Sequence, residues 1–485
     1  MVWADSMTRN MQIFVQKSNW VLIGACLILG INCALLWGHE LDDALIYARY
    51  LQNLIDGNGY VYNPGEYVNG LTSPLFGYLS IVPALILGDA RDGVMLVSVL
   101  AAFASMISFY YVLRLFITSE SMAAVSALLS ALASITYMNL GMEASLFTTL
   151  IAVSFYLYFK AHYFYLGICI GLAILARPEG VFLVPAMAMM TLFSDRNWPS
   201  IKCYVTPTLL VGSQLAFNYF YYEAFLPSSG LAKLSQGESG LWGANNFLMT
   251  LIGLFPFGVT HIGSWPILFV LLLLAVCSIM VQSARRYLVL SFTFLAFYTS
   301  FFALLNLPAQ AWYYAIHYSL FWSYVALGVC GLSDKFLSER DSAVNSGLIA
   351  FMLAGLFLQE PRLLSELGRT VRADYKEIGI WLSQNTAEDS SVAVVEIGTI
   401  GWYSKRRIID ILGLVTADVS SYVAEGDFES WLKLFPPDYI MVHEPLWEFE
   451  RVIGQVSQEG GLLEVADFDF PGFKLYAFNS SEVLR

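Results

Sequence analysis

Long apolar runs, separated by short polar segments, fill the first three quarters of the chain. A helix needs about 20 apolar residues to cross a bilayer, within a range of about 17 to 25. About eleven runs reach or approach this length, at 19–37, 93–114, 121–139, 143–160, 163–176, 181–193, 203–222, 264–282, 287–306, 312–332 and 345–358. The pattern predicts a polytopic α-helical membrane protein with about eleven spans, in a module that covers residues 1–358.

Two further apolar stretches, 74–88 and 245–262, do not read clearly as spans. Ser73-Pro74 is typical of an N-cap followed by proline at the first helical position, and Gly88 is typical of a helix end. Because 74–88 is short, we interpret it as an interfacial helix within the first outer loop, 38–92. The stretch 245–262 is ambiguous in the same way.

The distribution of basic residues tests this topology. With a cytoplasmic N-terminus, the inner segments hold ten basic residues: Arg9, Lys17, Arg114, Lys160, Arg196, Lys202, Arg285, Arg286, Lys335 and Arg340. The outer loops before residue 359 hold four, which are Arg49, Arg91, Arg177 and Lys233. This is the positive-inside bias expected of short loops. The first apolar run lacks a small-residue cleavage site, which favours an uncleaved span over a signal peptide.

The pattern changes near residue 359, where the apolar runs shorten to the length of strands. We expect strands at 392–396, 408–412, 439–443 and 474–478, with helices near 373–384 and 444–457. This order predicts one small soluble α/β domain over 359–485. On the eleven-span topology the domain is extracytoplasmic.

Composition and charge exclude several classes of protein. Hydrophobic residues make up 57% of the chain and charged residues only 13%, so lipid must solvate part of the apolar surface. A net charge of −13 argues against a nucleic-acid partner. The six cysteines all lie in or beside apolar segments, so the C-terminal domain has no disulfide framework. No zinc-binding pattern, P-loop or GxGxxG motif predicts a metal or nucleotide site.

The first outer loop carries the most informative chemistry. Asp42 and Asp43 directly follow the first span, and an amphipathic helix is expected at 44–56. Asp42 could simply cap that helix. Two adjacent carboxylates beside a membrane are costly unless they are used, however, and this favours a catalytic pair. An aspartate can act as the general base for a hydroxyl group, and of the two we favour Asp42.

Several motifs together resemble GT-C glycosyltransferases, closest to the mycobacterial terminal arabinofuranosyltransferases and their flagellar-motor-control-like bacterial relatives. The longest is the loop string DDALIYARYLQNLIDGNGYVYNPGEYVNGLTSP, at 42–74. Shorter matches follow in order at 141–147, 177–180, 221–233, 312–314 and 398–414. The chain departs from the family pattern at Ala144, which replaces threonine, and at Ser228, which replaces asparagine.

The resemblance implies a multi-pass enzyme of the bacterial inner membrane. It would move a sugar, arabinofuranose in the closest branch, from a polyprenyl-phosphate donor to a hydroxyl group of an extracytoplasmic glycan, lipid or protein. Direct displacement with one base implies inversion at the anomeric carbon. Arg177 suits the donor phosphate because its guanidinium can form bidentate hydrogen bonds. Lys233 suits the phosphate as a point charge.

The remaining candidates for substrate binding lie on the same predicted side of the membrane. They are Glu143, Glu179, Trp312, Tyr313 and Tyr314. A divalent cation could bridge the phosphate to Asp43 or Glu143, although no motif in the sequence indicates one.

Each candidate also has a simpler interpretation. Arg177 and Lys233 could snorkel at the membrane interface. Glu179 could have no role beyond an ion pair with Arg177, and Glu143 could cap a helix. The aromatic cluster 312–314 could be an interfacial anchor, and His317 an ordinary helix residue. We interpret the glycines of the C-terminal domain as turn residues; these are Gly398, Gly401 and Gly413.

Two other classes of function stay open. A transporter would usually carry inverted repeats and a polar site near the middle of the bilayer, and the sequence shows neither. A regulatory membrane protein would show no donor-dependent chemistry.

Overall fold

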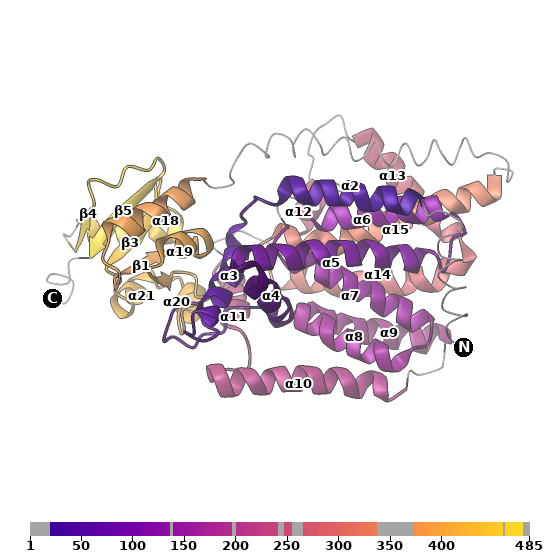
Figure 1. Cartoon of the computed structure of the whole chain (residues 1–485), viewed down its shortest axis with the longest axis horizontal. Coiled ribbons are helices and arrows are strands. Elements are labelled where there is room, and N and C mark those ends of the chain that lie inside the picture. The colour runs from indigo at the N-terminus through magenta and orange to yellow at the C-terminus, as the bar shows by residue number, and fades with distance from the viewer. Residues whose placement is uncertain are drawn as a thin grey trace.

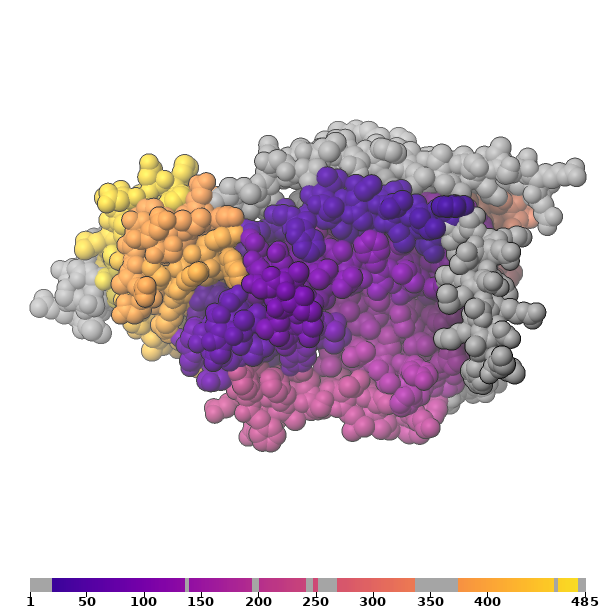
Figure 2. Space-filling view, in the orientation of Figure 1, coloured from indigo at the N-terminus to yellow at the C-terminus, as the bar shows by residue number. Residues whose placement is uncertain are grey.

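The structure is a computed structural model that describes residues 20–135, 139–195, 200–240, 247–254, 265–336, 373–458 and 461–478. It consists of a long helical bundle with a small sheet domain at one end (Figure 1). Helices α3 (Asp42–Ile55), α4 (Pro74–Leu87) and α11 (Ser228–Ser239) lie at this end of the bundle, next to the sheet domain. The two parts are in direct contact, and the surface of the first loop adjoins that of the sheet domain (Figure 2).

Most helices of the bundle follow the predicted apolar runs. They are α2 (Trp20–Leu36), α5 (Ala90–Leu113), α6 (Glu120–Ser134), α7 (Ala144–Phe159), α8 (Tyr163–Ala176), α9 (Leu183–Met190), α10 (Lys202–Tyr222), α12 (Phe247–Leu254), α13 (Trp265–Cys277), α14 (Arg285–Leu304) and α15 (Ala315–Phe336). The helical architecture is therefore confirmed.

The number of spans stays a prediction. Within the described residues, three helical stretches are long and apolar enough to cross a membrane, at Ala90–Leu113, Gln282–Leu304 and Ala311–Lys335. Seven other apolar helices are shorter, between 10 and 17 residues. The predicted span at 345–358 lies outside the described residues, as does the end of 245–262.

Small residues let the central helices approach each other closely. Every residue of α6 from Met122 to Ser134 is buried, and the run is rich in alanine and serine. Ser126 donates to the carbonyl of Trp322 at 2.9 Å, and Ser130 donates to that of Ser319 at 2.9 Å. Close packing and hydroxyl-to-backbone bonds of this kind are what hold helices together in an apolar solvent.

The predicted helix at 74–88 is confirmed as α4. It begins at Pro74 and ends at Gly88, which has φ of 73° and so adopts the left-handed conformation of a helix C-cap. One side packs on α5, while Val82 and Ile86 are exposed. An exposed apolar stripe suits an interfacial position, which stays a prediction.

The C-terminal domain is a five-stranded mixed sheet with helices. Its strands are β1 (Ser391–Val394), β2 (Arg407–Asp410), β3 (Tyr439–His443), β4 (Leu462–Glu464) and β5 (Phe473–Phe478), in the order β2-β1-β3-β5-β4. β1 pairs in parallel with β2 and β3, whereas β5 is antiparallel to β3 and β4. Its helices are α18 (Ala373–Asn385), α19 (Ile397–Ser404), α20 (Ser420–Glu425), α21 (Phe428–Leu434) and α22 (Arg451–Gln458).

The predicted strands are confirmed to within two residues at either end. The sequence pattern did not predict β4, which has only three residues, or the short helices α19, α20 and α21. The predicted domain boundary, between residues 358 and 359, lies outside the described residues.

Candidate active site

The two adjacent aspartates of the first loop have different surroundings. Helix α3 begins at Asp42 and its N-cap is Leu41, so Asp42 does not cap its own helix. Its carboxylate instead accepts from the backbone N–H groups of Gly398, at 3.1 Å, and Thr399, at 2.7 Å. These groups open helix α19, so Asp42 caps a helix of the other domain. Burial, followed by the charge of Asp43, raises the pKa of Asp42 to about 6.

Asp43 has no such role. Its side chain makes no hydrogen bond to the described part of the chain, and it lines a cavity together with Asp42 and Lys233. Burial raises the pKa of Asp43, and the charge of Lys233 opposes that shift. Asp43 is therefore the carboxylate that is free to receive a proton from a ligand.

Two glycines allow α19 to approach the first loop. A Cβ at Gly398 would lie 1.8 Å from the carbonyl oxygen of Asp42, and one at Gly401 would lie 2.0 Å from the hydroxyl of Tyr62. Their interpretation as turn residues is wrong, because both lie within α19, where the helix closely approaches the backbone of Asp42 and the side chains of Tyr62 and Arg49. Gly413, with φ of +80°, is a turn residue as predicted.

This packing gives a test of the contact between the domains. We expect Gly398→Ala to destabilise the protein by about 1–3 kcal/mol, the usual cost of overpacking, because backbone atoms of Asp42 occupy the space of the new methyl group. Gly212→Ala in α10 is the matched control, since nothing lies within 4 Å of a Cβ there. Thermal unfolding of both variants in detergent measures the difference, and equal midpoints would contradict the close contact.

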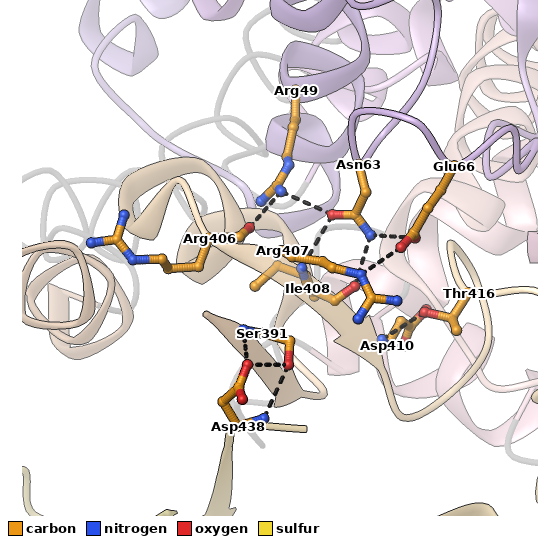
Figure 3. A network of polar contacts seen from close by, with 10 residues as sticks. All are labelled: Arg49, Asn63, Glu66, Ser391, Arg406, Arg407, Ile408, Asp410, Thr416 and Asp438. Atoms are coloured by element: carbon orange, nitrogen blue, oxygen red, sulfur yellow. Dashed lines mark hydrogen bonds and ion pairs between the residues drawn. The ribbon is translucent and has the colours of Figure 1, made fainter. Parts of the chain in front are cut away.

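Arg49 joins the first loop to the C-terminal domain (Figure 3). Its guanidinium donates to the carbonyls of Gly401 at 2.6 Å and Arg406 at 2.7 Å, and to Asn63 at 3.0 Å. Asn63 in turn donates to the carbonyl of Ile408 at 2.8 Å and accepts from its N–H at 3.1 Å.

The NPGE turn therefore anchors strand β2. At the end of this turn, Glu66 forms an ion pair with Arg407 at 2.6 Å (Figure 3). The first loop and 398–414, two of the segments that resemble GT-C enzymes, are thus in direct contact in space.

A second ionic group lies under the loop. Arg177 pairs with Glu143 at 2.6 Å and with Glu179 at 2.9 Å, and all three side chains are buried. The prediction that Glu179 pairs with Arg177 is confirmed. Because Arg177 is buried, its side chain does not snorkel at the membrane interface. Glu143 makes no capping hydrogen bond at the start of α7. The two glutamates more than balance the charge of Arg177, which leaves it less suited to a donor phosphate.

Lys233 is the available cation of the site. Its ammonium donates to the hydroxyl of Tyr313 at 2.8 Å and lies 5.9 Å from the ring centroid of Trp312. No carboxylate in the described ranges lies within ion-pair distance of it. Tyr313 also stacks against Arg177, whose guanidinium carbon is 4.8 Å from the ring centroid. The ring therefore links the buried ionic group to Lys233.

The aromatic cluster 312–314 is not an interfacial anchor, because all three side chains are buried. Trp312 and Tyr313 face cavities, as expected of binding residues. Tyr314 instead stacks on Phe247, with centroids 4.6 Å apart, and belongs to the core. His317 shares a hydrogen bond of 2.8 Å with Thr299, which agrees with its interpretation as a helix residue.

Two cavities meet at Lys233 and Trp312. The first, which we call the carboxylate cavity, has a volume of about 440 Å³ and is lined by the aspartate pair, Glu40 and residues of the C-terminal domain. The second, the apolar cavity, has a volume of about 320 Å³, and its apolar lining includes Leu231 and Leu234 of α11 and Phe301 and Phe302 of α14. Lys233 and Trp312 line both cavities, while Arg177 and Glu179 line only the apolar one.

Glu396 and Tyr375 of the C-terminal domain also line the carboxylate cavity, and neither was predicted from the sequence. No local pattern marks them, because they reach the site only through the contact between the two domains.

A divalent cation fits these residues poorly. Glu143 is bound to Arg177, and it does not line the cavity that holds Asp43. Among the described residues, no group of three or more histidine, cysteine, aspartate or glutamate side chains is arranged to hold a metal.

Comparison with known proteins bears on the fold. Over 95–96% of this chain, the structure superposes on two crystal structures of ArnT from Cupriavidus metallidurans. For ArnT bound to undecaprenyl phosphate the TM-score is 0.57, with 12% identity and 99% of that chain covered. For the apo state the TM-score is 0.56, with 14% identity and 98% covered. The chain has the ArnT fold. This agrees with the polytopic GT-C architecture implied by the sequence motifs.

Sequence families match parts of the chain. Residues 72–219 match a family described as dolichyl-phosphate-mannose-protein mannosyltransferase, and residues 366–478 match a domain family of unknown function. No curated protein sequence matches the chain. None of these comparisons supports the arabinofuranosyltransferase branch in particular.

Proposed function

We propose that this protein with the ArnT fold is an inverting glycosyltransferase of the bacterial inner membrane. It moves a sugar from a polyprenyl-phosphate donor to an extracytoplasmic hydroxyl group. One observation carries the proposal: an apolar cavity and a carboxylate cavity meet at Lys233, which forms no ion pair with a carboxylate of the described residues. The crystal structure of ArnT with undecaprenyl phosphate and the mannosyltransferase family match support the same class of donor.

The donor occupies the junction of the two cavities. The apolar cavity takes the part of the lipid chain next to the phosphate, and Lys233 neutralises the phosphate as a point charge. Arg177 has a supporting role in this scheme. Its pairing with Glu143 and Glu179 fixes the ring of Tyr313, which holds Lys233 in place.

The reaction is a single displacement. Asp43 takes the proton of the acceptor hydroxyl, and the oxygen attacks the anomeric carbon of the donor sugar. The bond from that carbon to the phosphate oxygen breaks, and the phosphate keeps the electron pair while Lys233 stabilises the charge that develops on it. Attack opposite the leaving phosphate inverts the anomeric carbon. Arabinofuranose is the sugar that the family resemblance suggests.

The test uses purified protein in lipid nanodiscs with a panel of undecaprenyl-phosphate sugars. We expect release of the sugar to water or to an added acceptor, because in this scheme Asp43 acts as a base beside the donor junction. If the wild-type protein binds no undecaprenyl phosphate and releases no sugar from any donor, the transport or regulatory alternatives become the better explanation.

The donor site has its own prediction. We expect Lys233→Met to weaken binding of undecaprenyl phosphate by at least about tenfold, the loss of one charge-assisted contact. Lys233→Arg should recover part of the affinity. Lys433→Met is the control, since Lys433 is exposed and pairs with Glu429 within α21. Titration with undecaprenyl phosphate in nanodiscs measures the affinity; unchanged affinity in well-folded Lys233→Met would remove Lys233 from the site.

A further inference from the structure

The C-terminal domain contributes a carboxylate to the same cavity as the base. Glu396 lies directly after β1 and before α19, and it lines the carboxylate cavity opposite the residues of the first loop. This inference rests on the proposed function, in which the carboxylate cavity receives the acceptor.

Two residues of the domain, Tyr375 and His443, hold Glu396 in position. Its Oε1 atom accepts from the hydroxyl of Tyr375 at 3.2 Å and lies 3.2 Å from Nε2 of His443. On the other side, Nδ1 of His443 lies 2.8 Å from Glu450. The imidazole also stacks on Trp447, with centroids 3.7 Å apart. Although burial lowers the pKa of His443, hydrogen bonds to Glu396 and Glu450 raise it to about 9.

The other oxygen of Glu396 has no partner. The residue is only 9% exposed, and its Oε2 atom is buried without a hydrogen bond in the described part of the chain. A buried carboxylate oxygen that is left unpaired costs free energy. A carboxylate that lines a cavity and keeps one oxygen without a partner can accept a hydrogen bond from a donor group of a ligand.

The charges of the cavity define what that ligand can be. Glu40 is paired with Arg91 and with Lys376, and Asp42 is occupied by the N-terminus of α19. Asp43 faces only Lys233, whose charge the donor phosphate neutralises in the proposed reaction. Glu396 shares the single imidazole of His443 with Glu450, so this group of three keeps a net negative charge. A negatively charged group would be repelled here, whereas hydroxyl and ammonium groups would donate hydrogen bonds to both carboxylates.

We propose that Glu396 binds the acceptor and selects a glycosyl unit that presents hydroxyl or ammonium groups, and no anionic group, next to the attacked oxygen. The C-terminal domain is then half of the acceptor site, with the first loop as the other half.

Three methyl glycosides serve as probes: methyl β-D-glucoside, its 2-amino-2-deoxy analogue and the corresponding glucuronide. Saturation-transfer NMR titrations with full-length protein in nanodiscs give their affinities. We expect the amino sugar to bind best and the glucuronide worst. In Glu396→Gln, affinity for the amino sugar should fall by about tenfold, as expected for one charge-assisted hydrogen bond. The difference in affinity between the amino sugar and the glucuronide should also decrease.

Control variants separate recognition from folding. Glu448→Gln makes the same chemical change on an exposed position of the same domain and should leave all three affinities unchanged. Glu396→Asp keeps the charge and should retain the order of preference even if Glu396→Gln folds poorly. An unchanged order and unchanged affinities in folded Glu396→Gln overturn the inference, as does preferential binding of the glucuronide by the wild type.

Failure of the proposed function gives a different pattern. If the wild type binds the amino sugar through Glu396 but neither binds nor cleaves any lipid-phosphate sugar, the ligand site stands and the transferase proposal falls. If sugar transfer is observed while Glu396→Gln keeps wild-type affinities and a wild-type KM for acceptor, only the role of Glu396 is lost.

Discussion

Asp43→Asn is expected to lower the rate of sugar transfer by about 10²–10⁴-fold, the usual contribution of a general base. An amide cannot take the proton of the acceptor hydroxyl, and it occupies nearly the same volume as the carboxylate. Donor binding and thermal stability should therefore stay close to those of the wild type. Single-turnover transfer from an undecaprenyl-phosphate sugar measures the rate, and a wild-type rate in this variant would exclude Asp43 as the base.

The pH dependence of transfer follows from the same residue. A base works only when it is deprotonated, and burial raises the pKa of Asp43 above that of an ordinary aspartate. The rate should consequently fall as pH decreases, beginning at a higher pH than a solvent-exposed aspartate would give.

Asp42→Asn is the matched control for this prediction. The asparagine side chain can still accept one of the two N–H groups that open α19, but its NH₂ group faces the other. We expect a loss of stability of about 1–3 kcal/mol, the cost of leaving one buried N–H group without an acceptor, with a smaller loss of rate than in Asp43→Asn. The reverse order of rates would restore Asp42 as the base.

Arg177→Ala is expected to be the most destabilising substitution in the membrane module, by about 3–5 kcal/mol. Removing the guanidinium leaves Glu143 and Glu179 as buried carboxylates, 1% and 7% exposed, without their cation. Thermal unfolding in detergent should show a large decrease in the midpoint. A change no greater than that of Arg114→Ala, in which an exposed pair with Glu120 is lost, would contradict the prediction.

A triple variant separates the two roles that Arg177 could have. Adding Glu143→Gln and Glu179→Gln to Arg177→Ala removes the uncompensated charges and should recover much of the lost stability. If Arg177 acts only by fixing Tyr313, the recovered protein keeps substantial affinity for undecaprenyl phosphate through Lys233. Complete loss of that affinity in a stable triple variant would show that Arg177 holds the phosphate directly.

Local patterns predicted much of this structure. The long apolar runs predicted most helices of the bundle, and short apolar runs predicted strands such as β3, because a fully buried strand reads as a short continuous apolar run. The acidic pair of the first loop was identifiable in the same way, since two carboxylates beside an apolar run are chemically conspicuous.

The division of roles within the site was not predictable. The sequence favoured Asp42 as the base, but its hydrogen-bond partners lie 356 and 357 residues away along the chain. Gly398 looked like a turn residue for the same reason: the backbone that demands a glycine there belongs to Asp42. Glu396 carries no motif at all, and only the packing of one domain on the other brings it to the cavity.

The contact between Asp42 and α19 also has a consequence in time. Ribosomes add about 5–20 residues per second, so the 356 residues between Asp42 and Gly398 correspond to roughly 20–70 s of synthesis. Throughout that interval the first loop has already left the ribosome, but Arg49, Asn63 and Asp42 lack the carbonyl and N–H groups that fix them. The nascent membrane module therefore holds an unfinished site, which is complete only when the last quarter of the chain has been synthesised and has folded against the loop.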